Sequence, residues 1–514
     1  MLDDAVAAWL DSVSERASYE PLLALLRARG YSDVHLAHGQ REFGKDIVAK
    51  RHDTQWAFQV KVGDIGQGEW RELDGQLNEL RVVDLGHSSF DATLSRRPVL
   101  VTTGRLVGNA SDLFREHNRR ARERDEPELT LWDRDTLIGY LSGEPGAVLR
   151  GSIDAALLAT LGAVEERKAT TASIEVFSHR WTEWDIGRVS GAGVIEAALI
   201  CERLKSVERI DLACHMALCL VRAAWAAHGS ESRAAVADAA GLLFETYALQ
   251  LWHECDERLL REKGLVGFSG ASAWVTYPIR CCRIAELLGL LAIRLRPTDT
   301  ELALEIGRWL VQFAHAQPGV AHPVSDAYAV CLIPAAITLA AADRDAAIDL
   351  LRATTVWLTD ASQPEQFGLA GTDTTPAEEI ERLIGNPLDS IDCPRRPMSL
   401  IATVLLDLCT ALGASELYAD AHNDIRACEI APMIIRLDDG RDQYLRAGEA
   451  NQLELNIDYA DELGDGELAA AHHADRAGSK LCDKHRVWDL LAISSALRDR
   501  YHYSAIAAVV ANPN

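Results

Sequence analysis

The hydrophobic pattern of this chain changes near residue 150, and this change restricts the fold more than any other sequence feature. Before residue 150, helix-like segments alternate with short strand-like segments. From about Gly151 onward, strand signals become rare and long stretches follow the period of a helix. Since 514 residues are also too many for one hydrophobic core, we expect an α/β domain over residues 1–150 and a separate helical part after it.

The first part is expected to form a mixed central sheet flanked by helices, an α/β sandwich. Residues 98–103 (PVLVTT) are continuously apolar, as in strands buried on both faces, whereas residues 56–62 alternate. The expected elements are, in order, a helix over 19–29, strands over 34–36, 46–49 and 56–62, a helix over 70–83, a strand over 98–103, a helix over 109–123, a strand over 129–132 and a helix over 135–141.

The remainder is expected to be a large all-α region, either a helix bundle or a solenoid-like array. Ile284, Leu287, Leu288, Leu291 and Leu295 fall at helical spacing and form one apolar stripe. Short breaks between such stripes favour antiparallel helix pairs, but no repeat of fixed length is visible. We expect a helical domain over 151–359, an irregular connection rich in Pro, Gly and Asp over 360–397, and a C-terminal helical region over 398–514.

The charge distribution argues against a protein that coats DNA over a broad face. The formal net charge is -25, yet residues 1–150 contain 20 basic and 25 acidic side chains, so most of the excess acidity lies after them. An acidic helical region is poorly suited to bind a phosphate backbone. A small cleft in the first domain remains compatible with nucleic acid, because metal ions can supply local positive charge there.

Cysteine usage and hydropathy predict a cytoplasmic protein. The 11 cysteines lie between Cys201 and Cys482 without a CxxC pair, as expected for buried thiols in a reducing compartment. The acidic start MLDDAVAAWLDSVSE does not resemble a signal peptide. The longest apolar run, 327–342, contains Pro334 and is too short to span a bilayer, so a buried helix is expected there.

The segment GKDIVAKRHDTQWAFQVKVGD, residues 44–64, carries the chemistry. Metal-assisted hydrolysis of a phosphodiester needs hard oxygen ligands, an activated water and a nearby positive group. Asp46 begins one expected strand, and Gln59 and Lys61 lie two apart on the next, so both point to one side. Phe58 and Val60 then face the core.

The spacing D-x(12)-Q-x-K resembles the signature of PD-(D/E)XK nucleases, in the form found in Mrr-like restriction endonucleases, where Gln replaces the second acid. Upstream, Tyr19-Glu20 and LLRARGYSDV resemble the opening helix of this family and its turn into the first strand. Downstream, PVLVTTG and LWDRDTLIGYL resemble its closing elements. The similarity covers roughly residues 15–142 and implies a restriction-endonuclease-like α/β sandwich followed by the large all-α region.

The resemblance also implies roles for individual residues. Asp46 is the principal metal ligand, with Gln59 as a second ligand, the main-chain carbonyl of Val60 as a third, and Glu20 completing the site from the first helix. Lys61 orients the attacking water or stabilises the developing phosphorane charge. The implied cofactor is Mg²⁺, with Mn²⁺ as the alternative. The chain departs from the motif in having Lys45 in place of the proline, and the uncharged Gln59 leaves fewer anions for the metal.

Other charged residues admit two interpretations. Arg41 and Lys45 border the expected cleft and could contact phosphate, although a solvated loop is an equally good interpretation. Arg119, Arg120, Arg122 and Arg124 are interleaved with acids, which favours an exposed helix end over a DNA-binding face. His and Cys residues of the helical region, such as Cys214 and His215, are adjacent on a helix and are more readily explained as structural residues.

The resemblance implies a Mg²⁺-dependent endodeoxyribonuclease of bacterial restriction or anti-phage defence, whose helical part senses a trigger or recruits a protein partner. DNA is the expected substrate, and a homodimer or higher oligomer is expected because cutting two strands takes two active sites. The alternative is a regulatory or scaffold protein with a degenerate nuclease fold. An RNase would use the same site.

Overall fold

The computed structural model describes residues 2–37, 45–85, 89–148, 155–229, 233–255, 257–261, 272–363, 366, 368–372, 376–384, 396, 398–436, 444–445, 456–459 and 486–511. The chain divides into two compact units. The N-terminal unit comprises Met1–Ala169, Glu183–Arg203 and Ala227–Ala239, and the helical unit comprises Thr170–Thr182, Leu204–Ala226 and Ala240–Asn514.

The N-terminal unit contains a mixed five-stranded sheet in the order β1-β2-β3-β4-β5. The first three strands are antiparallel neighbours, whereas β3, β4 and β5 run parallel. The strands are β1 (Ser32–Leu36), β2 (Ile47–Arg51), β3 (Thr54–Lys61), β4 (Ser95–Thr102) and β5 (Thr130–Trp132). This confirms the mixed sheet flanked by helices that the sequence predicts.

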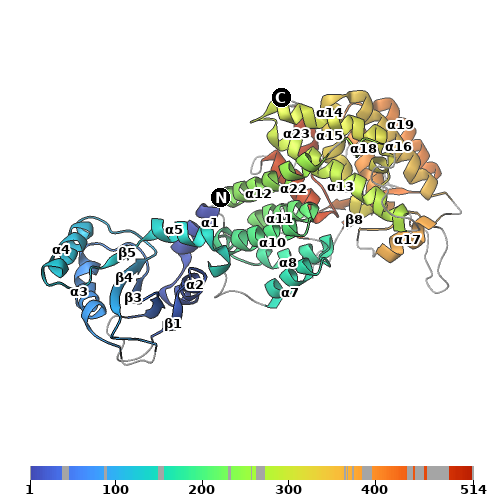
Figure 1. Cartoon of the computed structure of the whole chain (residues 1–514). Coiled ribbons are helices and arrows are strands. Elements are labelled where there is room, and N and C mark those ends of the chain that lie inside the picture. Colours follow the sequence, from blue (N-terminus) through green and yellow to red (C-terminus); the bar gives the residue numbers. More distant parts are fainter. Residues whose placement is uncertain are drawn as a thin grey trace. The chain divides into compact units, whose positions relative to one another are not determined.

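Helices cover both faces of this sheet (Figure 1). The helices α3 (Gln67–Val82) and α4 (Ala110–Glu123) lie on one face, and α2 (Glu15–Ala28) lies on the other. The remaining helical elements that lie wholly or partly in this unit are α1 (Leu2–Ser12), α5 (Arg134–Gly143), α6 (Pro145–Val148), α7 (Ala155–Glu165), α9 (Ile186–Arg188), the π-helix η2 (Val189–Gly193), α10 (Val194–Ser206) and α12 (Arg233–Glu254).

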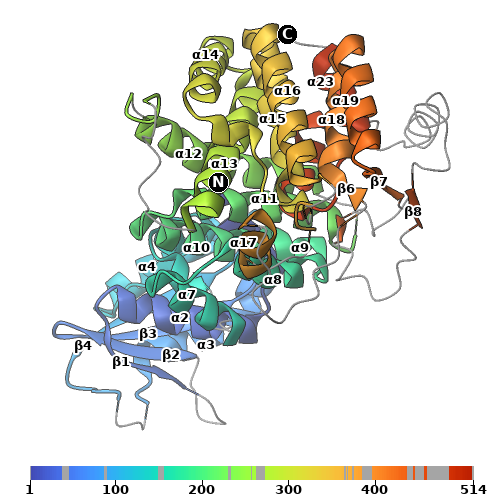
Figure 2. The same ribbon diagram turned by 90° about the vertical axis from the view of Figure 1, so that its right-hand side faces the viewer.

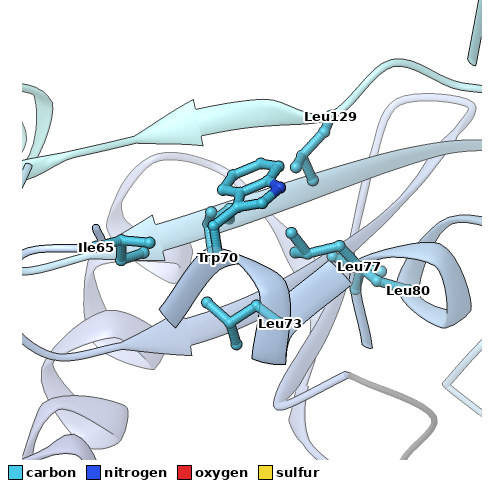
Figure 3. Close-up of a cluster of buried hydrophobic side chains, with 8 residues drawn as sticks. Ile65, Trp70, Leu73, Leu77, Leu80 and Leu129 are labelled. Atoms are coloured by element: carbon cyan, nitrogen blue, oxygen red, sulfur yellow. The ribbon is translucent and has the colours of Figure 1, made fainter. Parts of the chain in front are cut away.

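The core under α3 fixes this helix against the sheet. Its buried side chains recur at spacings of three and four residues along α3, which places them on one stripe of the helix. Figure 3 shows the aliphatic side chains gathered around the indole of Trp70. The cluster consists of Ala57, Ile65, Trp70, Leu73, Leu77, Leu80, Leu100 and Leu129.

Aromatic side chains fill the opposite face of β3. Phe58 points away from Ala57 because successive side chains of a strand alternate. Its ring lies 5.3 Å from that of Trp132 and 6.2 Å from that of Tyr31. Strand β3 is therefore buried on both faces, and Gln59 is only 4% exposed. The expected alternation is present, but Gln59 is enclosed instead of lining an open surface.

The helical unit consists mainly of long helices packed in sequence order, with α13 against α14 and α15, and α15 against α16 (Figure 2). Besides the end of α10 and most of α12, its described helical elements are α8 (Thr171–Thr182), α11 (Ile210–Ala226), α13 (Ser272–Leu295), α14 (Thr300–Ala316), the 3-10 helices η3 (Pro318–Ala321) and η4 (Asp326–Cys331), α15 (Leu332–Ala342), α16 (Arg344–Ala361), α17 (Pro376–Ile384), α18 (Leu400–Ala411), α19 (Ser415–Ala427), α22 (Val487–Leu497) and α23 (Tyr503–Ala511).

Two features of the helical unit go beyond the sequence-based expectation. The connection expected to be irregular over 360–397 contains the helix α17. The C-terminal region contains a three-stranded sheet formed by β6 (Met398–Ser399), β7 (Ala431–Arg436) and β8 (Asn456–Tyr459). The apolar run over 327–342 forms η4 and the buried helix α15, as expected. Within the described parts of the chain, no helix is both long and apolar enough to cross a membrane.

Candidate active site

The β2–β3 hairpin places Asp46 opposite Gln59. Ile47 pairs with Phe58 in the antiparallel ladder, so Asp46, one residue before β2, faces Gln59 on β3. The backbone amide of Asp46 donates to the carbonyl of Phe58 at 2.9 Å, so Asp46 stays bonded to β3 just beyond the regular register. The side chains of Asp46 and Gln59 meet directly, because Gln59 Nε2 lies 2.7 Å from Asp46 Oδ2. The structure thus brings together the acid and the amide that the sequence spacing relates.

Asp46 is held by two donors from β3. Gln59 Nε2 donates to Asp46 Oδ2 at 2.7 Å, and the backbone amide of Val60 donates to the same oxygen at 2.6 Å. The Asp46 side chain is nearly enclosed, with 9% of the residue exposed. Hydrogen bonds to a carboxylate are stronger than bonds between neutral groups, so this pair of donors fixes the orientation of the acid.

The side-chain oxygen of Gln59 has no hydrogen-bond partner among the described residues, although it is buried. The amide nitrogen of Gln59 donates a hydrogen bond to Asp46. This bond determines the orientation of the amide, so the oxygen is the atom left without a partner. A buried acceptor without a donor is unfavourable unless water or an ion completes it. Gln59 Oε1 is therefore suited to bind a hard cation or an ordered water beside Asp46.

Lys61 follows Gln59 by two residues, so strand alternation starts its side chain on the same side of β3, while the tip of the side chain turns toward α2. Its Nζ lies 3.4 Å from Glu15 Oε2, at the beginning of α2. The backbone amide of Val60 touches Asp46, so covalent geometry keeps Lys61 Cα within about 8 Å of that carboxylate oxygen. Asp46 and Gln59 are therefore in direct contact and the backbone of Lys61 lies close to them, while a shared catalytic site of all three residues stays a prediction.

The carboxylate beside Lys61 is that of Glu15, which the sequence-based analysis did not identify. Glu15 Oε1 also accepts a hydrogen bond from the hydroxyl of Tyr19 at 3.2 Å. Glu20 lies five residues further along α2, on a different face of the helix, and is exposed. No described contact joins Glu20 to Asp46, Gln59 or Lys61, so its role as a metal ligand stays a prediction.

The structure corrects the expectation for Lys45. This side chain is fully buried, and its Nζ donates to the carbonyl of Glu79 near the end of α3 at 3.1 Å. Burial lowers the pKa of Lys45 to about 8, with the charge of Arg96 acting in the same direction. An enclosed ammonium group bonded to a helix carbonyl cannot also contact a DNA phosphate. Arg41, the other expected phosphate contact, lies outside the described residues.

The ends of β3 and β4 are joined directly beyond Lys61. Thr102 Oγ1 donates to the carbonyl of Gly63 at 2.6 Å, and the amide of Gly63 donates to Thr103 Oγ1 at 2.9 Å. Gly104 crosses this segment so closely that a Cβ there would lie 2.3 Å from the backbone nitrogen of Asp64. Only glycine fits at such a crossing. These contacts fix the strand end that carries Lys61.

The oxygen donors of the site suit a Mg²⁺-type cation with few anionic ligands. Asp46 supplies a carboxylate and Gln59 a buried, unpartnered amide oxygen, and both are hard donors. Within the described residues, no group of three or more His, Cys, Asp or Glu side chains is arranged to hold a metal ion. The residues present therefore fit a divalent cation, but with less negative charge than a site built from several acids.

The arginines of α4 do not form a free basic face. Arg119 is paired with Glu116 and Glu123, and Arg120 is paired with Glu116. Arg122 lies 3.4 Å from Glu128, beyond the end of the helix. Exposed pairs within one helix neutralise each other and leave little net field for a phosphate backbone. This supports the interpretation of an exposed helix end.

Comparison with known proteins agrees with the fold and the motif. Residues 10–141 match the model of the restriction endonuclease family Mrr_cat. This match covers the five-stranded sheet, the β2–β3 hairpin and the helices α2 to α4. The region over residues 10–141 is therefore similar to the restriction-endonuclease domain of this family. No curated protein and no solved structure matched the chain.

Proposed function

We propose that the domain over residues 1–150 is a Mg²⁺-dependent endodeoxyribonuclease that hydrolyses phosphodiester bonds. The family match supports a nuclease acting on DNA. The observation that carries the proposal is the hydrogen-bonded pair of Asp46 and Gln59 on neighbouring strands, with Lys61 projecting from the same side of β3. Hydrolysis of a phosphodiester needs this combination of hard oxygen donors and a positive group.

In this proposal, Asp46 and Gln59 Oε1 hold the cation, and the main-chain carbonyl of Val60 supplies a further oxygen. Mn²⁺ can take the place of Mg²⁺. When bound, such a cation polarises the phosphate and lowers the pKa of coordinated water. Glu20 is proposed as an additional acid from α2, supplied when substrate and metal are in place.

Lys61 is proposed to act directly on the reacting groups. Its ammonium group either orients the attacking water or stabilises the negative charge that develops on the phosphorane. Glu15 holds this ammonium group in the absence of substrate, at 3.4 Å. Glu15 is therefore a positioning residue, and a phosphate oxygen entering the site would compete with it for Lys61.

We further propose a role in restriction or anti-phage defence, in the cytoplasm, with the helical region sensing a trigger or binding a protein partner. The strongly acidic composition after residue 150 supports contact with proteins or small ligands more than contact with DNA. A homodimer or higher oligomer is proposed, because cleavage of both strands requires two copies of the site.

Plasmid cleavage in the presence of Mg²⁺ or Mn²⁺ tests the assignment. Asp46→Ala and Lys61→Ala should each lower the cleavage rate by about 100-fold or more, since each removes a group that acts on the reacting atoms. Lys50→Ala is the matched control, because Lys50 lies on the same hairpin but is paired with Asp33 at 2.9 Å. Cleavage that survives both substitutions would remove Asp46 and Lys61 from the active site.

A regulatory or scaffold protein with a degenerate site is the second candidate. Two observations favour it. Asp46 Oδ2 already accepts hydrogen bonds from Gln59 and Val60, and among the described residues no group of three or more His, Cys, Asp or Glu side chains could hold a metal ion. DNA and RNA substrates, each with both metals, separate the possibilities. Cleavage of RNA alone would indicate an RNase, and no cleavage in any combination would support the scaffold.

A further inference from the structure

Three elements of the helical unit meet around a set of buried charged side chains. The helices α13 and α22 pack against each other, and both pack against η4 (α13 and α22 are labelled in Figure 1). Arg283 and Glu286 come from α13, Cys331 from η4, and Arg498 from the end of α22. Each of these side chains is at least nine-tenths buried. Charged groups are rarely enclosed in this way unless they are paired or bind a ligand.

Arg498 directly contacts a backbone carbonyl and an aromatic ring, and the carboxylates of Glu175 and Glu286 act on it without forming an ion pair. Its Nε donates to the carbonyl of Ala327 at 3.1 Å, and its guanidinium carbon lies 4.4 Å from the centre of the Tyr328 ring. Among the described residues, no carboxylate lies within ion-pair distance of it, and its buried Nη2 has no hydrogen-bond partner. The backbone is also strained, with φ of 63° at a position that closes α22.

Arg283 and Glu286 form an ion pair that leaves one atom of each partner unsatisfied. Arg283 Nη1 donates to Glu286 Oε2 at 2.5 Å, and the Cys331 thiol donates to the same oxygen at 3.0 Å. Arg283 Nη2 and Glu286 Oε1 are buried and have no hydrogen-bond partner among the described residues, while the Ser495 hydroxyl helps to lower the pKa of the Glu286 carboxyl. The unmet groups of this centre are therefore two guanidinium donors and one carboxylate acceptor.

The two guanidinium groups lie close enough to act on each other. Burial lowers the pKa of Arg283, and the charge of Arg498 acts in the same direction, but Glu286, with smaller effects of Cys331 and Asp211, raises this pKa above its ordinary value. Both arginines, in turn, help to hold the pKa of Glu286 below its usual value against the effect of burial. Glu286 thus acts on both cations, Asp211 also acts on Arg283 and Glu175 on Arg498, and what stays unmet is one hydrogen-bond donor of each guanidinium group.

We propose that this centre, formed by Arg283, Glu286 and Arg498, binds a phosphate group, either as inorganic phosphate or as the end of a phosphomonoester. Two guanidinium donors match the oxygens of such a group in geometry and charge. The acceptor Glu286 Oε1 requires an O–H donor, which a partly protonated phosphate supplies and a fully ionised sulfate or carboxylate does not. This site belongs to the helical unit and does not depend on the proposed nuclease activity.

The full-length protein in metal-free buffer, without nucleic acid, provides the test. Inorganic phosphate and glycerol 3-phosphate are compared with sulfate and chloride at equal ionic strength. At millimolar concentration, one or both phosphate compounds should raise the Tm by about 2 °C or more, because a ligand bound only by the folded state stabilises it. The same compound should slow hydrogen exchange in peptides covering α13 and α22. An effect of inorganic phosphate alone identifies the free ion, and an effect of glycerol 3-phosphate identifies a phosphomonoester.

Substitution of Arg498 links these effects to the site. Arg498→Gln should abolish both the shift in Tm and the local protection, whereas Arg352→Gln, at an exposed arginine paired with Asp349, should retain both. Should Arg498→Gln fail to fold, Arg498→Lys keeps the charge without the planar fork and should bind at least about 10-fold more weakly. An equal response to sulfate, an unchanged response in the Arg498 variants, or no response to phosphate would overturn the proposal. The last result would mean that ordered water satisfies these atoms.

Discussion

The hydrogen bond between Gln59 and Asp46 determines the electrostatics of the proposed active site. An amide stands where a second carboxylate would add negative charge, so one carboxylate and one neutral oxygen face the proposed cation. Affinity for hard divalent cations rises with the number of charged ligands. Without metal, the amide stabilises the folded protein more than a carboxylate would. The amide donates a hydrogen bond to Asp46, whereas a second carboxylate would repel it.

Gln59→Glu should therefore have two separable effects. The Mg²⁺ concentration for half-maximal cleavage should fall by about 10-fold, since a charged ligand replaces a neutral one. In the absence of metal, the free energy of unfolding should fall by about 1–3 kcal/mol, because a donor to a buried carboxylate is lost and two acids are brought together. Metal titrations of cleavage and urea unfolding in a chelator measure the two effects.

Gln55→Glu is the matched control for this substitution. Gln55 lies on the same strand and on the same side, is fully buried, and bonds to the carbonyl of Ala49 and the amide of Asp91. Its substitution should also destabilise the protein, but it should leave the Mg²⁺ requirement unchanged. A metal requirement that shifts equally in both variants, or in neither, would contradict a role of Gln59 at the cation.

The sequence predicts the Asp46–Gln59 pair because both residues belong to one hairpin, whose register follows from local spacing. It does not predict the partner of Lys61, because the expected helix began at Tyr19. The structure begins α2 at Glu15, after Ser14 caps it by accepting from the amide of Ala17. A serine followed by an acid is a common signal for a helix start, and it could have identified Glu15.

At the scale of elements, the packing of α4 on α3 depends on a buried histidine. His117 is 6% exposed and contacts Arg81 at 3.3 Å and Asp74 at 3.4 Å, both on α3. Burial and the charge of Arg81 lower the pKa of His117 below its ordinary value of 6.5, although Asp74 acts in the opposite direction. Arg120, on α4 itself, adds a smaller effect in the same direction as Arg81.

This environment predicts a loss of stability in mild acid. The unfolded chain takes up a proton on His117 near pH 6.5, while the folded protein does so only at lower pH. The contribution of neutral His117 to the free energy of unfolding is therefore complete above about pH 6.5. It is lost as the pH falls through the lower pKa that His117 has in the folded protein. Urea unfolding at about pH 7.5 and pH 5.5 measures this decline. The free energy of unfolding should fall less between the two pH values in His117→Gln than in the unsubstituted protein. An identical decline in both proteins would mean that His117 does not titrate in this range.

Element order in the N-terminal unit was predictable because its strands and helices have distinct periodicities and short connections. The small sheet of the helical unit was not predictable by the same means. Its strand β6 has only two residues, Met398–Ser399, and pairs with Ala431 and Pro432, more than thirty positions away. A two-residue strand has no measurable alternation, and its partner is determined by tertiary packing.

At the scale of the whole molecule, the two units interleave along the sequence. Residues 183–203 and 227–239 belong to the N-terminal unit, whereas 170–182 and 204–226 belong to the helical unit. The sequence gives no sign of this, because helices have the same periodicity in both units and periodicity does not show which core a helix joins. Hydrophobic patterning therefore predicts that these segments are helical, but it does not predict to which unit each belongs.

The charge of the whole molecule predicts weak, mildly salt-dependent DNA binding. The net charge is -25, and the exposed arginines of α4 are largely neutralised by neighbouring acids. A protein that makes few phosphate contacts releases few counterions, so its affinity changes little with salt. Fluorescence anisotropy of Asp46→Ala with a labelled duplex, between about 50 and 200 mM salt, should give a slope that corresponds to about two or three phosphate contacts. A slope that corresponds to about six or more would contradict this, and would require a basic surface outside the described residues.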